Sequence, residues 1–256
     1  MLADPYDVVL LDLDGVLYRW PDPISGAADA VAALRGAGKL LTFVTNNSSR
    51  TPAQVAERLS SVGVTASPEE VVTSALVTAT ILSERGVRSA FVVGEEGLVE
   101  ALAAAGIEAV HEFDDEPDVV VVGFDRGADY SKLKDASVLV ERGIPLVASN
   151  ADPSFPAPGG ESWPGAGALL AAIETTTGAR GEVFGKPEPP LFERALASAG
   201  GGRPIVVGDR LDTDIAGAVR LGWDSALVLT GATRRDEVEG SPWRPTIVLD
   251  DLSGLI

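Results

Sequence analysis

The 256-residue sequence has no cysteine, one methionine and one histidine, and only 5% of its residues are aromatic. Without cysteine the chain has no disulfide framework, no thiolate zinc site and no cysteine nucleophile, and nothing else in it points to an oxidising compartment. A lone histidine, His111, also excludes a metal site built from several histidines. Because His111 precedes an acidic stretch at residues 112–116, we expect it at the solvated surface, without a catalytic role.

Basic residues are also scarce, with 20 lysines and arginines against 38 acidic residues and a net charge of -18. A surface this negative repels DNA, RNA and anionic lipid headgroups, so we expect neither a nucleic-acid partner nor a membrane partner. Such a surface does not attract an anionic substrate either. Any phosphate site must therefore make its own positive field from a metal, a lysine and backbone amides.

Long hydrophobic runs are absent as well: stretches such as residues 119–122 are far shorter than the roughly 20 residues of a membrane-spanning helix. The N-terminus leads directly into a buried-strand pattern instead of a basic segment, an apolar segment and a small-residue cleavage site. We therefore expect a cytoplasmic protein. Its length allows one large domain, or a core domain with a smaller one inserted or appended.

Short runs rich in valine and leucine alternate with alanine-rich stretches of helical period. The predicted strands are residues 8–11, 40–44, 90–93, 119–122, 145–148, 205–207 and 226–229. The predicted helices are residues 27–35, 52–62, 95–105, 132–142, 166–175, 190–199 and 213–221. Strand alternating with helix predicts an α/β fold with a parallel sheet. The one irregular stretch, residues 152–165, is rich in proline and glycine and is a candidate binding loop.

Polar side chains follow two of the predicted strands. Asp12 and Asp14 end the first strand in DLDGVL, where an α/β sheet presents its ligands, although such a pair alone can also cap a turn. The second strand ends in TNNSSR at residues 45–50, where hydroxyls and the free amides of the next helix suit an anion. An ordinary loop with a helix cap is the alternative for this segment.

Two further segments carry charge. Lys186, in Gly-Lys-Pro before a predicted helix, could balance carboxylates and a phosphate, although most lysines simply lie at the surface. A later buried strand runs into GDRLDTD, which places Asp209, Asp212 and Asp214 within six residues. Hard oxygen ligands at strand ends are what magnesium prefers. We expect Asp212 to cap the following helix instead of binding metal.

Together, DLDGVL, TNNSSR, GKP and GDRLDTD lie in order at four loop junctions, and the whole chain resembles the haloacid dehalogenase superfamily. The resemblance is to its class IIA phosphatases, and implies a doubly wound, Rossmann-like parallel-sheet core with an inserted, smaller α/β cap. The implied domains are residues 1–78 and 181–256 for the core and 79–180 for the cap. Members of this class often form dimers through the cap, so the resemblance allows a homodimer here.

The resemblance also implies the chemistry. Asp12 would be the nucleophile that forms an aspartyl-phosphate, and Asp14 would protonate the leaving group and then activate water. Magnesium would be bound by Asp12, Asp209 and the backbone carbonyl of Asp14, with Asp214 in support. The phosphoryl oxygens would be held by Thr45, Asn46 and Lys186.

The segment SNAD at the end of the strand at residues 145–148 resembles the family's specificity loop, so we expect Asn150 and Asp152 to face the substrate, with loop capping as the alternative. Arg50 and Arg210, beside two of the motifs, either touch substrate or form salt bridges.

The segments TNNSSRTPAQVAERLSSVGV and GDRLDTDI are similar to actinobacterial glycerol 3-phosphate phosphatases. Glycerol 3-phosphate is thus the expected substrate, with phosphoglycolate, pyridoxal phosphate and a nucleoside monophosphate as alternatives. A phosphotransferase or mutase could use the same intermediate, and a non-catalytic binding protein could keep the fold. A dinucleotide-binding dehydrogenase is disfavoured because GxGxxG does not follow the first strand, and a P-loop nucleotidase because GxxxxGK[ST] is absent.

Overall fold

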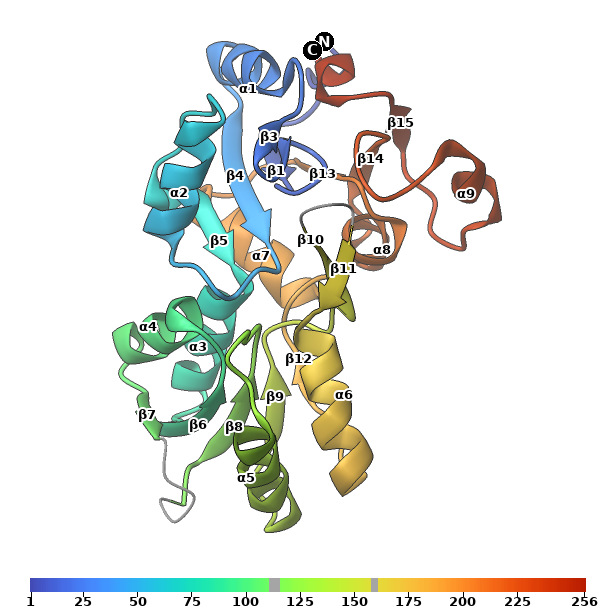
Figure 1. Cartoon of the computed structure of the whole chain (residues 1–256). Helices are drawn as coiled ribbons and strands as arrows, with labels where there is room; N and C mark the ends of the chain where they lie inside the picture. The colour runs from blue at the N-terminus through green and yellow to red at the C-terminus, as the bar shows by residue number, and fades with distance from the viewer. Residues whose placement is uncertain (111–115, 158–160) are drawn as a thin grey trace. The chain divides into compact units, whose positions relative to one another are not determined.

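The computed structural model describes residues 1–110, 116–157 and 161–256, and the chain divides into two compact units. The first unit comprises Met1–Thr45, Pro52–Val72 and Lys186–Ile256, and the second comprises Asn46–Thr51 and Thr73–Gly185 (Figure 1). The second unit is therefore inserted in the first as two segments, with Pro52–Val72 of the first unit between them. Its longer segment extends a few residues beyond the predicted 79–180 at each end, and Asn46–Thr51 fell within the predicted core. The role of the second unit as a cap stays a prediction.

The first unit is built on a six-stranded sheet in the order β15-β14-β13-β1-β4-β5. The strands are β1 (Val8–Leu11), β4 (Leu40–Thr45), β5 (Val71–Thr73), β13 (Pro204–Gly208), β14 (Asp224–Val228) and β15 (Ile247–Leu249). The central strand β1 pairs in parallel with β4 on one side and β13 on the other. Parallel neighbours end at the same edge of the sheet, so the residues after β1 and β13 are brought together.

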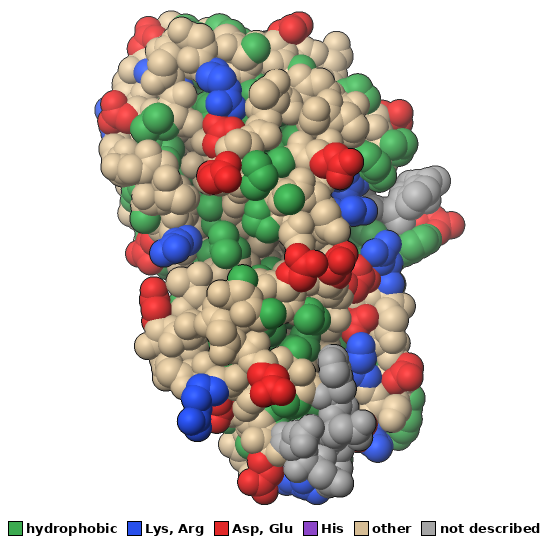
Figure 2. Space-filling view, turned by 90° about the vertical axis from the view of Figure 1, so that its left-hand side faces the viewer, with side chains coloured by type: hydrophobic (Ala, Val, Ile, Leu, Met, Phe, Trp, Pro, Cys, Tyr) green, Lys and Arg blue, Asp and Glu red, His purple; other side chains and the backbone are tan. Residues whose placement is uncertain are grey.

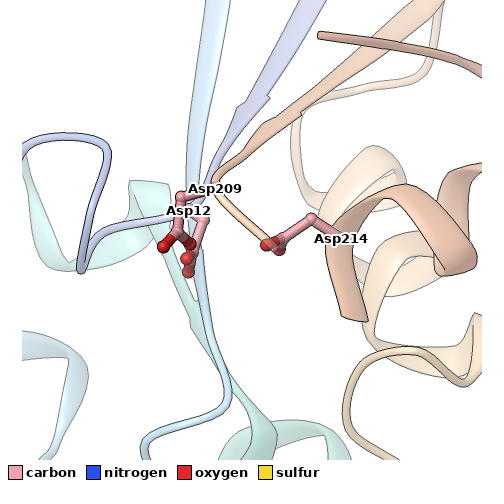
Figure 3. A group of neighbouring side chains, drawn as sticks. All are labelled: Asp12, Asp209 and Asp214. Atoms are coloured by element: carbon pink, nitrogen blue, oxygen red, sulfur yellow. The ribbon is translucent and has the colours of Figure 1, made fainter. Parts of the chain in front are cut away.

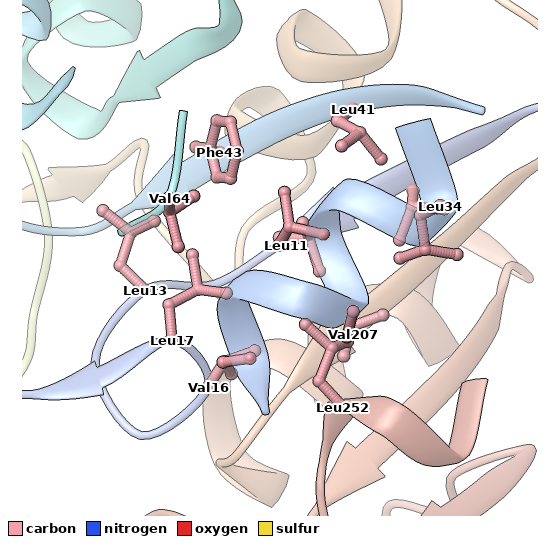
Figure 4. Packing of buried hydrophobic residues seen from close by; sticks show 14 of the residues in the cluster. Leu11, Leu13, Val16, Leu17, Leu34, Leu41, Phe43, Val64, Val207 and Leu252 are labelled. Carbon is pink, nitrogen blue, oxygen red and sulfur yellow. The ribbon is translucent and has the colours of Figure 1, made fainter. Parts of the chain in front are cut away.

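Helices cover both faces of this sheet. The helices of the first unit are α1 (Ala27–Gly36), α2 (Pro52–Ser61), α7 (Pro189–Ser198), α8 (Ala216–Leu221) and α9 (Arg235–Gly240). Val9 and Leu11 of β1 pack in one buried cluster with residues of α1 and α2, part of which Figure 4 shows. On the opposite face Thr42 of β4 donates its hydroxyl to a carbonyl of α7, 3.4 Å away. Burial on both faces explains the unbroken apolar strand sequences.

The second unit has its own five-stranded parallel sheet, in the order β12-β9-β8-β6-β7. Its strands are β6 (Ser89–Val93), β7 (Glu108–Val110), β8 (Val119–Val122), β9 (Leu146–Ala148) and β12 (Glu182–Val183). Its helices are α3 (Ser74–Glu84), α4 (Glu96–Ala104), α5 (Tyr130–Glu141) and α6 (Ala166–Thr177). Alternate residues of β6 and β8 pack with α5 and α6 in one cluster. Both units thus confirm the predicted α/β class with parallel sheets.

Several elements were not predicted. Helix α3 follows β5 directly and buries Ser74 and Thr78 together with its apolar residues, so its sequence shows no separate polar face. Residues 152–165, predicted to be irregular, contain an antiparallel pair, β10 (Ser154–Ala157) and β11 (Glu161–Pro164), and a binding role for this segment stays a prediction. A second short hairpin, β2 (Tyr18–Arg19) and β3 (Asp22–Pro23), follows β1. Hairpins this short leave little periodic signal in a sequence.

Within the described part of the chain, none of the helices combines the length and the apolar character that crossing a membrane requires.

Candidate active site

Two predicted site residues stand at the ends of adjacent parallel strands. Asp12 follows β1 directly, and its backbone N–H donates to the carbonyl of Val207 in β13 at 2.9 Å. Asp209 follows β13, so the strand pairing alone sets the two carboxylates side by side, as Figure 3 shows. The expectation that these two acids would meet at one sheet edge therefore rests on parallel pairing.

These two carboxylates form a metal-sized group with Asp214. Oxygen atoms of Asp12, Asp209 and Asp214 all lie within 4.8 Å of one another. The Oδ2 atom of Asp209 accepts a hydrogen bond from the N–H of Ala232 at 2.6 Å, whereas its buried Oδ1 has no hydrogen-bond partner among the described residues. A buried oxygen without a partner is costly unless something else binds it. Hard carboxylate oxygens of this kind fit a magnesium ion.

Lys186 lies among these acids. Its Nζ atom lies 2.6 Å from Oδ1 of Asp12 and 2.7 Å from Oδ1 of Asp214, and its side chain is only 5% exposed. Burial alone would lower the pKa of Lys186, but the charges of Asp12 and Asp214 outweigh it and raise that pKa above its ordinary value. Lys186 therefore keeps its positive charge where a phosphoryl group would need it.

The carboxylates themselves resist ionisation. Burial raises the pKa of Asp12 well above its ordinary value, and the charge of Lys186 opposes this shift. Burial, together with the negative charge of Asp214, raises the pKa of Asp209 to about 7. A divalent cation would favour the ionised forms of both groups, because an opposite charge at close range stabilises a carboxylate.

Asp14 lies just beyond the nucleophile candidate, in the turn that leads to β2. Burial raises its pKa, while the positive charges of Arg58 and Lys186 act in the opposite direction. A carboxyl with a raised pKa holds a proton closer to neutral pH and can pass it on. Asp14 therefore has the environment of a general acid and base.

Arg58, whose charge opposes the rise in the pKa of Asp14, stacks on two aromatic rings. The guanidinium of Arg58, in α2, lies 3.7 Å from the ring centroid of Trp20 and 5.0 Å from that of Tyr18. Tyr18 also forms an isolated bridge with Asp14. Arg58 was not among the predicted site residues, because helical period alone does not show which residue of α2 faces the end of β1.

Asp214 is a partner for Lys186 in the structure. Its Oδ1 bonds to Lys186, and its Oδ2 accepts the backbone N–H of Arg210 at 3.2 Å. A Cβ on Gly208 would lie 2.2 Å from the Cβ of Asp214, so only glycine fits there. The predicted capping role of Asp212 is wrong: the helical turn Leu211–Ile215 begins before it, and Asp212 pairs with Arg210 at 2.8 Å. Of the two roles predicted for Arg210, the structure therefore shows the salt bridge.

Thr45 is the last residue of β4 and belongs to the first unit, whereas Asn46 belongs to the second. Within the second unit, Asn46 contacts both predicted specificity residues. Its Nδ2 donates to Oδ2 of Asp152 at 3.0 Å, and its carbonyl accepts Nδ2 of Asn150 at 2.8 Å. Substrate contacts of Asn46, Asn150 and Asp152 stay a prediction. His111 lies outside the described residues.

One segment beside the acids was also missed. Residues 230–233 follow β14, and the backbone N–H of Ala232 donates to Asp209. The strand at residues 226–229 was predicted, so the strand-end rule could have indicated this loop. Its small and neutral side chains gave no chemical signal, because its contribution comes largely from backbone groups.

Comparisons with known proteins place this arrangement in a family. The model of haloacid dehalogenase-like hydrolases matches residues 9–108, and a second, HAD-hydrolase-like model matches residues 183–255. The D-glycerol 3-phosphate phosphatase of Mycobacterium tuberculosis is 40% identical over 99% of this chain and 72% of its own length. The acid sugar phosphatase of Staphylococcus aureus is 38% identical over 98% of this chain and 97% of its own length.

Solved structures agree with these matches. The glycerol phosphate phosphatase of Mycobacterium tuberculosis in complex with magnesium has a TM-score of 0.93 at 39% identity, over 99% of this chain and 77% of that one. The 4-nitrophenylphosphatase of Thermotoga maritima has a TM-score of 0.92 at 32% identity, over 100% and 98% of the two chains. Sequence and structure thus both confirm the predicted resemblance, and the chain belongs to the haloacid dehalogenase-like hydrolase family.

Proposed function

We propose that this protein is a magnesium-dependent phosphatase that hydrolyses a small phosphorylated metabolite, with glycerol 3-phosphate as the best candidate. One observation carries the proposal: the carboxylate of Asp12 stands at the end of β1, 2.6 Å from Lys186. Beside it lies Asp209, whose Oδ1 has no hydrogen-bond partner in the described part of the chain. A nucleophile, a fixed cation and metal-binding oxygens are what phosphoryl transfer through aspartate requires. The relatives confirm the reaction class, phosphoric monoester hydrolysis.

The magnesium ion would be held by Asp12, Asp209 and the backbone carbonyl of Asp14. When bound, it neutralises charge on the phosphoryl oxygens. Lys186 contributes a positive charge of its own beside Asp12, and its two ion pairs hold its ammonium in place. Fixed charges of this kind need no reorganisation as the transition state forms. Asp214 supports the reaction by holding Lys186.

The reaction then follows from the carboxyl groups. A carboxylate oxygen of Asp12 attacks phosphorus, and the bond to the leaving oxygen breaks while Asp14 donates a proton to that oxygen. The alcohol then departs, and the phosphoryl group remains on Asp12 as an aspartyl-phosphate. Water then attacks phosphorus and gives a proton to Asp14, and the bond between Asp12 and phosphorus breaks to release inorganic phosphate. The raised pKa of Asp14 supports both of its steps.

Glycerol 3-phosphate is proposed because the relative that is 40% identical over almost the whole chain is a D-glycerol 3-phosphate phosphatase. A sugar phosphate is a second candidate, since an acid sugar phosphatase is 38% identical and matches at nearly full length. Phosphoglycolate, pyridoxal phosphate and nucleoside monophosphates belong in the same test. Transfer to a sugar hydroxyl instead of water is distinguished by counting free phosphate against phosphorylated product.

The second unit is proposed to be the cap, with Asn150 and Asp152 near the substrate and with a homodimer formed through this unit. A cytoplasmic location and the lack of a nucleic-acid or membrane partner are proposed from the net charge of -18 and the absence of cysteine. On the face in Figure 2, Lys and Arg side chains stand singly or in small groups between acidic ones. This distribution supports the proposed lack of a nucleic-acid or anionic-membrane partner.

The test is phosphate release from this substrate panel, with and without magnesium, by the wild type and by Asp12→Asn. We expect magnesium-dependent hydrolysis with a preference for glycerol 3-phosphate, and none by the variant, because no other group forms the intermediate. Circular dichroism should show that the variant keeps its fold. Turnover by a correctly folded, pure Asp12→Asn protein would refute the mechanism.

A further inference from the structure

A loop outside the four sequence motifs contacts the group proposed to bind metal. Residues 230–233, which we call the β14 loop, follow β14 and turn back over Asp209. The N–H of Ala232 donates to Oδ2 of Asp209 at 2.6 Å, and the N–H of Thr233 donates to the backbone carbonyl of Asp209 at 3.2 Å. The loop therefore holds both the side chain and the main chain of Asp209.

This contact decides which oxygen of Asp209 remains available. With Oδ2 engaged by Ala232, the buried Oδ1 is left without a hydrogen-bond partner among the described residues. Rotation of the carboxylate out of its plane would break the 2.6 Å hydrogen bond from Ala232. Such bonds are among the stronger ones in proteins when the acceptor is ionised, as Asp209 would be beside a divalent cation. The loop thus fixes the orientation in which Asp209 presents Oδ1.

Gly231 permits this close approach. A Cβ built on Gly231 would lie 2.0 Å from Oδ2 of Asp209 and 2.3 Å from its Cβ, distances that no real side chain tolerates. Only a residue without a Cβ lets the backbone pass this near to the carboxylate. The glycine is therefore required by contact with Asp209 and not by the conformation of the turn.

The same loop holds the main chain beside Asp14. The hydroxyl of Thr230 donates to the carbonyl of Gly15 at 2.6 Å, and Nε of Arg19 donates to the carbonyl of Thr230 at 2.7 Å. Gly15 has a φ of 81°, and a Cβ there would lie 2.4 Å from Oδ2 of Asp209 and 2.9 Å from Cα of Gly231. The turn after Asp14, the Asp209 carboxylate and the β14 loop are thus packed directly against one another.

We propose that the β14 loop is a positioning element for magnesium, which orients the Asp209 carboxylate and the main chain at Asp14 together through Thr230, Gly231 and Ala232. The loop would act through Asp209 and the main chain at Gly15, which its hydrogen bonds reach. This inference rests on the proposed magnesium-dependent function. It assigns a role to residues that lie outside the nucleophile, the lysine and the acidic motifs.

The first test compares Thr230→Val, which removes the hydroxyl at nearly constant volume, with Thr230→Ser, which keeps it. Magnesium affinity is measured by isothermal titration calorimetry on the full chain, and the melting temperature is measured in EDTA. We expect Thr230→Val to weaken magnesium binding about 10- to 100-fold, the usual effect of losing a contact that orients a ligand. Thr230→Ser should bind like the wild type, and both should melt normally in EDTA.

The second test uses Gly231→Ala, with Gly240→Ala as its matched control, because a Cβ at Gly240 meets nothing within 4 Å. Gly231→Ala should also raise the magnesium concentration needed for half-maximal phosphatase activity. The kcat at saturating magnesium should recover toward the wild-type value, which a misfolded protein would not show. The control should match the wild type in both quantities.

The results separate this inference from the proposed function. If the wild type binds magnesium and folded Thr230→Val binds it equally well, the loop does not position the ligands and the inference is overturned. If the wild type itself binds no magnesium, the proposed cofactor fails and the inference fails with it. If Gly231→Ala does not fold, the magnesium affinities of Thr230→Val and Thr230→Ser still test the inference.

Discussion

Replacing Lys186 with methionine tests the charge arrangement at the centre of the site. Methionine fills a similar volume without a charge, so the change removes two ion pairs and little packing. The carboxylates of Asp12 and Asp214 are then left side by side in a buried environment. We expect a loss of both stability and activity.

The magnitude follows from burial. Removing one partner of a buried ion pair typically costs about 3–5 kcal/mol, because a charge is left uncompensated. The side chains of Lys186, Asp12 and Asp214 are 5%, 12% and 1% exposed, so solvent screens these pairs little. For a protein of this size each kcal/mol lowers the melting temperature by about 2–4 °C. If Lys186→Met loses about 5 kcal/mol, the upper end of the range for a buried pair, its melting temperature in EDTA should fall by about 10–20 °C.

Activity should fall for a separate reason. Lys186 is proposed to stabilise charge on the phosphoryl oxygens, and losing one such donor typically lowers kcat about 100- to 1000-fold. Urea unfolding and calorimetry in EDTA measure the stability, and phosphate release at saturating magnesium measures kcat. Added magnesium should restore part of the lost stability, because the cation balances the same carboxylates.

Lys134→Met is the matched control, since Lys134 pairs with Asp135 at 2.8 Å but its side chain is 52% exposed. Exposed pairs contribute about 0–1 kcal/mol, so this variant should unfold like the wild type. Lys186→Met that is as stable in EDTA as Lys134→Met would refute the assignment of Lys186 as the cation that balances Asp12 and Asp214.

Three further changes test neighbouring parts of the structure. Asp14→Asn should lower kcat about 100- to 10,000-fold with glycerol 3-phosphate. The loss should be smaller with p-nitrophenyl phosphate, whose leaving group needs no proton, and an equal loss with both substrates would contradict the general-acid role. Gly208→Ala should destabilise the chain by about 1–3 kcal/mol in urea unfolding, because its Cβ would meet Asp214 at 2.2 Å; Gly36→Ala, which meets nothing within 4 Å, is its control. Burial raises the pKa of Glu95, but hydrogen bonds and charge from Arg126 outweigh it and lower that pKa below 4.5. The wild type should therefore be more stable than Arg126→Gln above about pH 4.5, and this difference should disappear as the pH falls through the lowered pKa of Glu95. A difference in stability that does not change with pH would contradict a contribution from this pair.

Much of the fold could be predicted because strands buried on both faces leave unbroken runs of valine and leucine. Such runs gave β1 and β8 their observed bounds, Val8–Leu11 and Val119–Val122. The same rule brought Asp12 and Asp209 together, since parallel neighbours share an edge. Helix α3 was missed because its buried side includes Ser74 and Thr78, so the polar and apolar residues do not separate into two faces.

The site was predictable where its chemistry resides in charged side chains and unpredictable where it resides in backbone groups. Lys186 and Asp214 carry charges that the sequence displays directly. Ala232 contributes an N–H and Gly231 contributes the absence of a side chain, neither of which a sequence pattern marks. Asp212 shows the converse error, because an acid before a helix suggests a cap, but here it pairs with Arg210.

The charges of the site explain how so acidic a protein can bind a phosphate. Asp12, Asp209 and Asp214, when ionised, carry three negative charges against the single positive charge of Lys186, which leaves a formal charge of -2 within one buried group. One magnesium ion carries the opposite charge, so the ion that the family uses balances these side chains. Because the balance is achieved locally among buried groups, where salt screens little, the protein needs no positive surface around the site. The net charge of -18 is thus compatible with the binding of one small phosphomonoester.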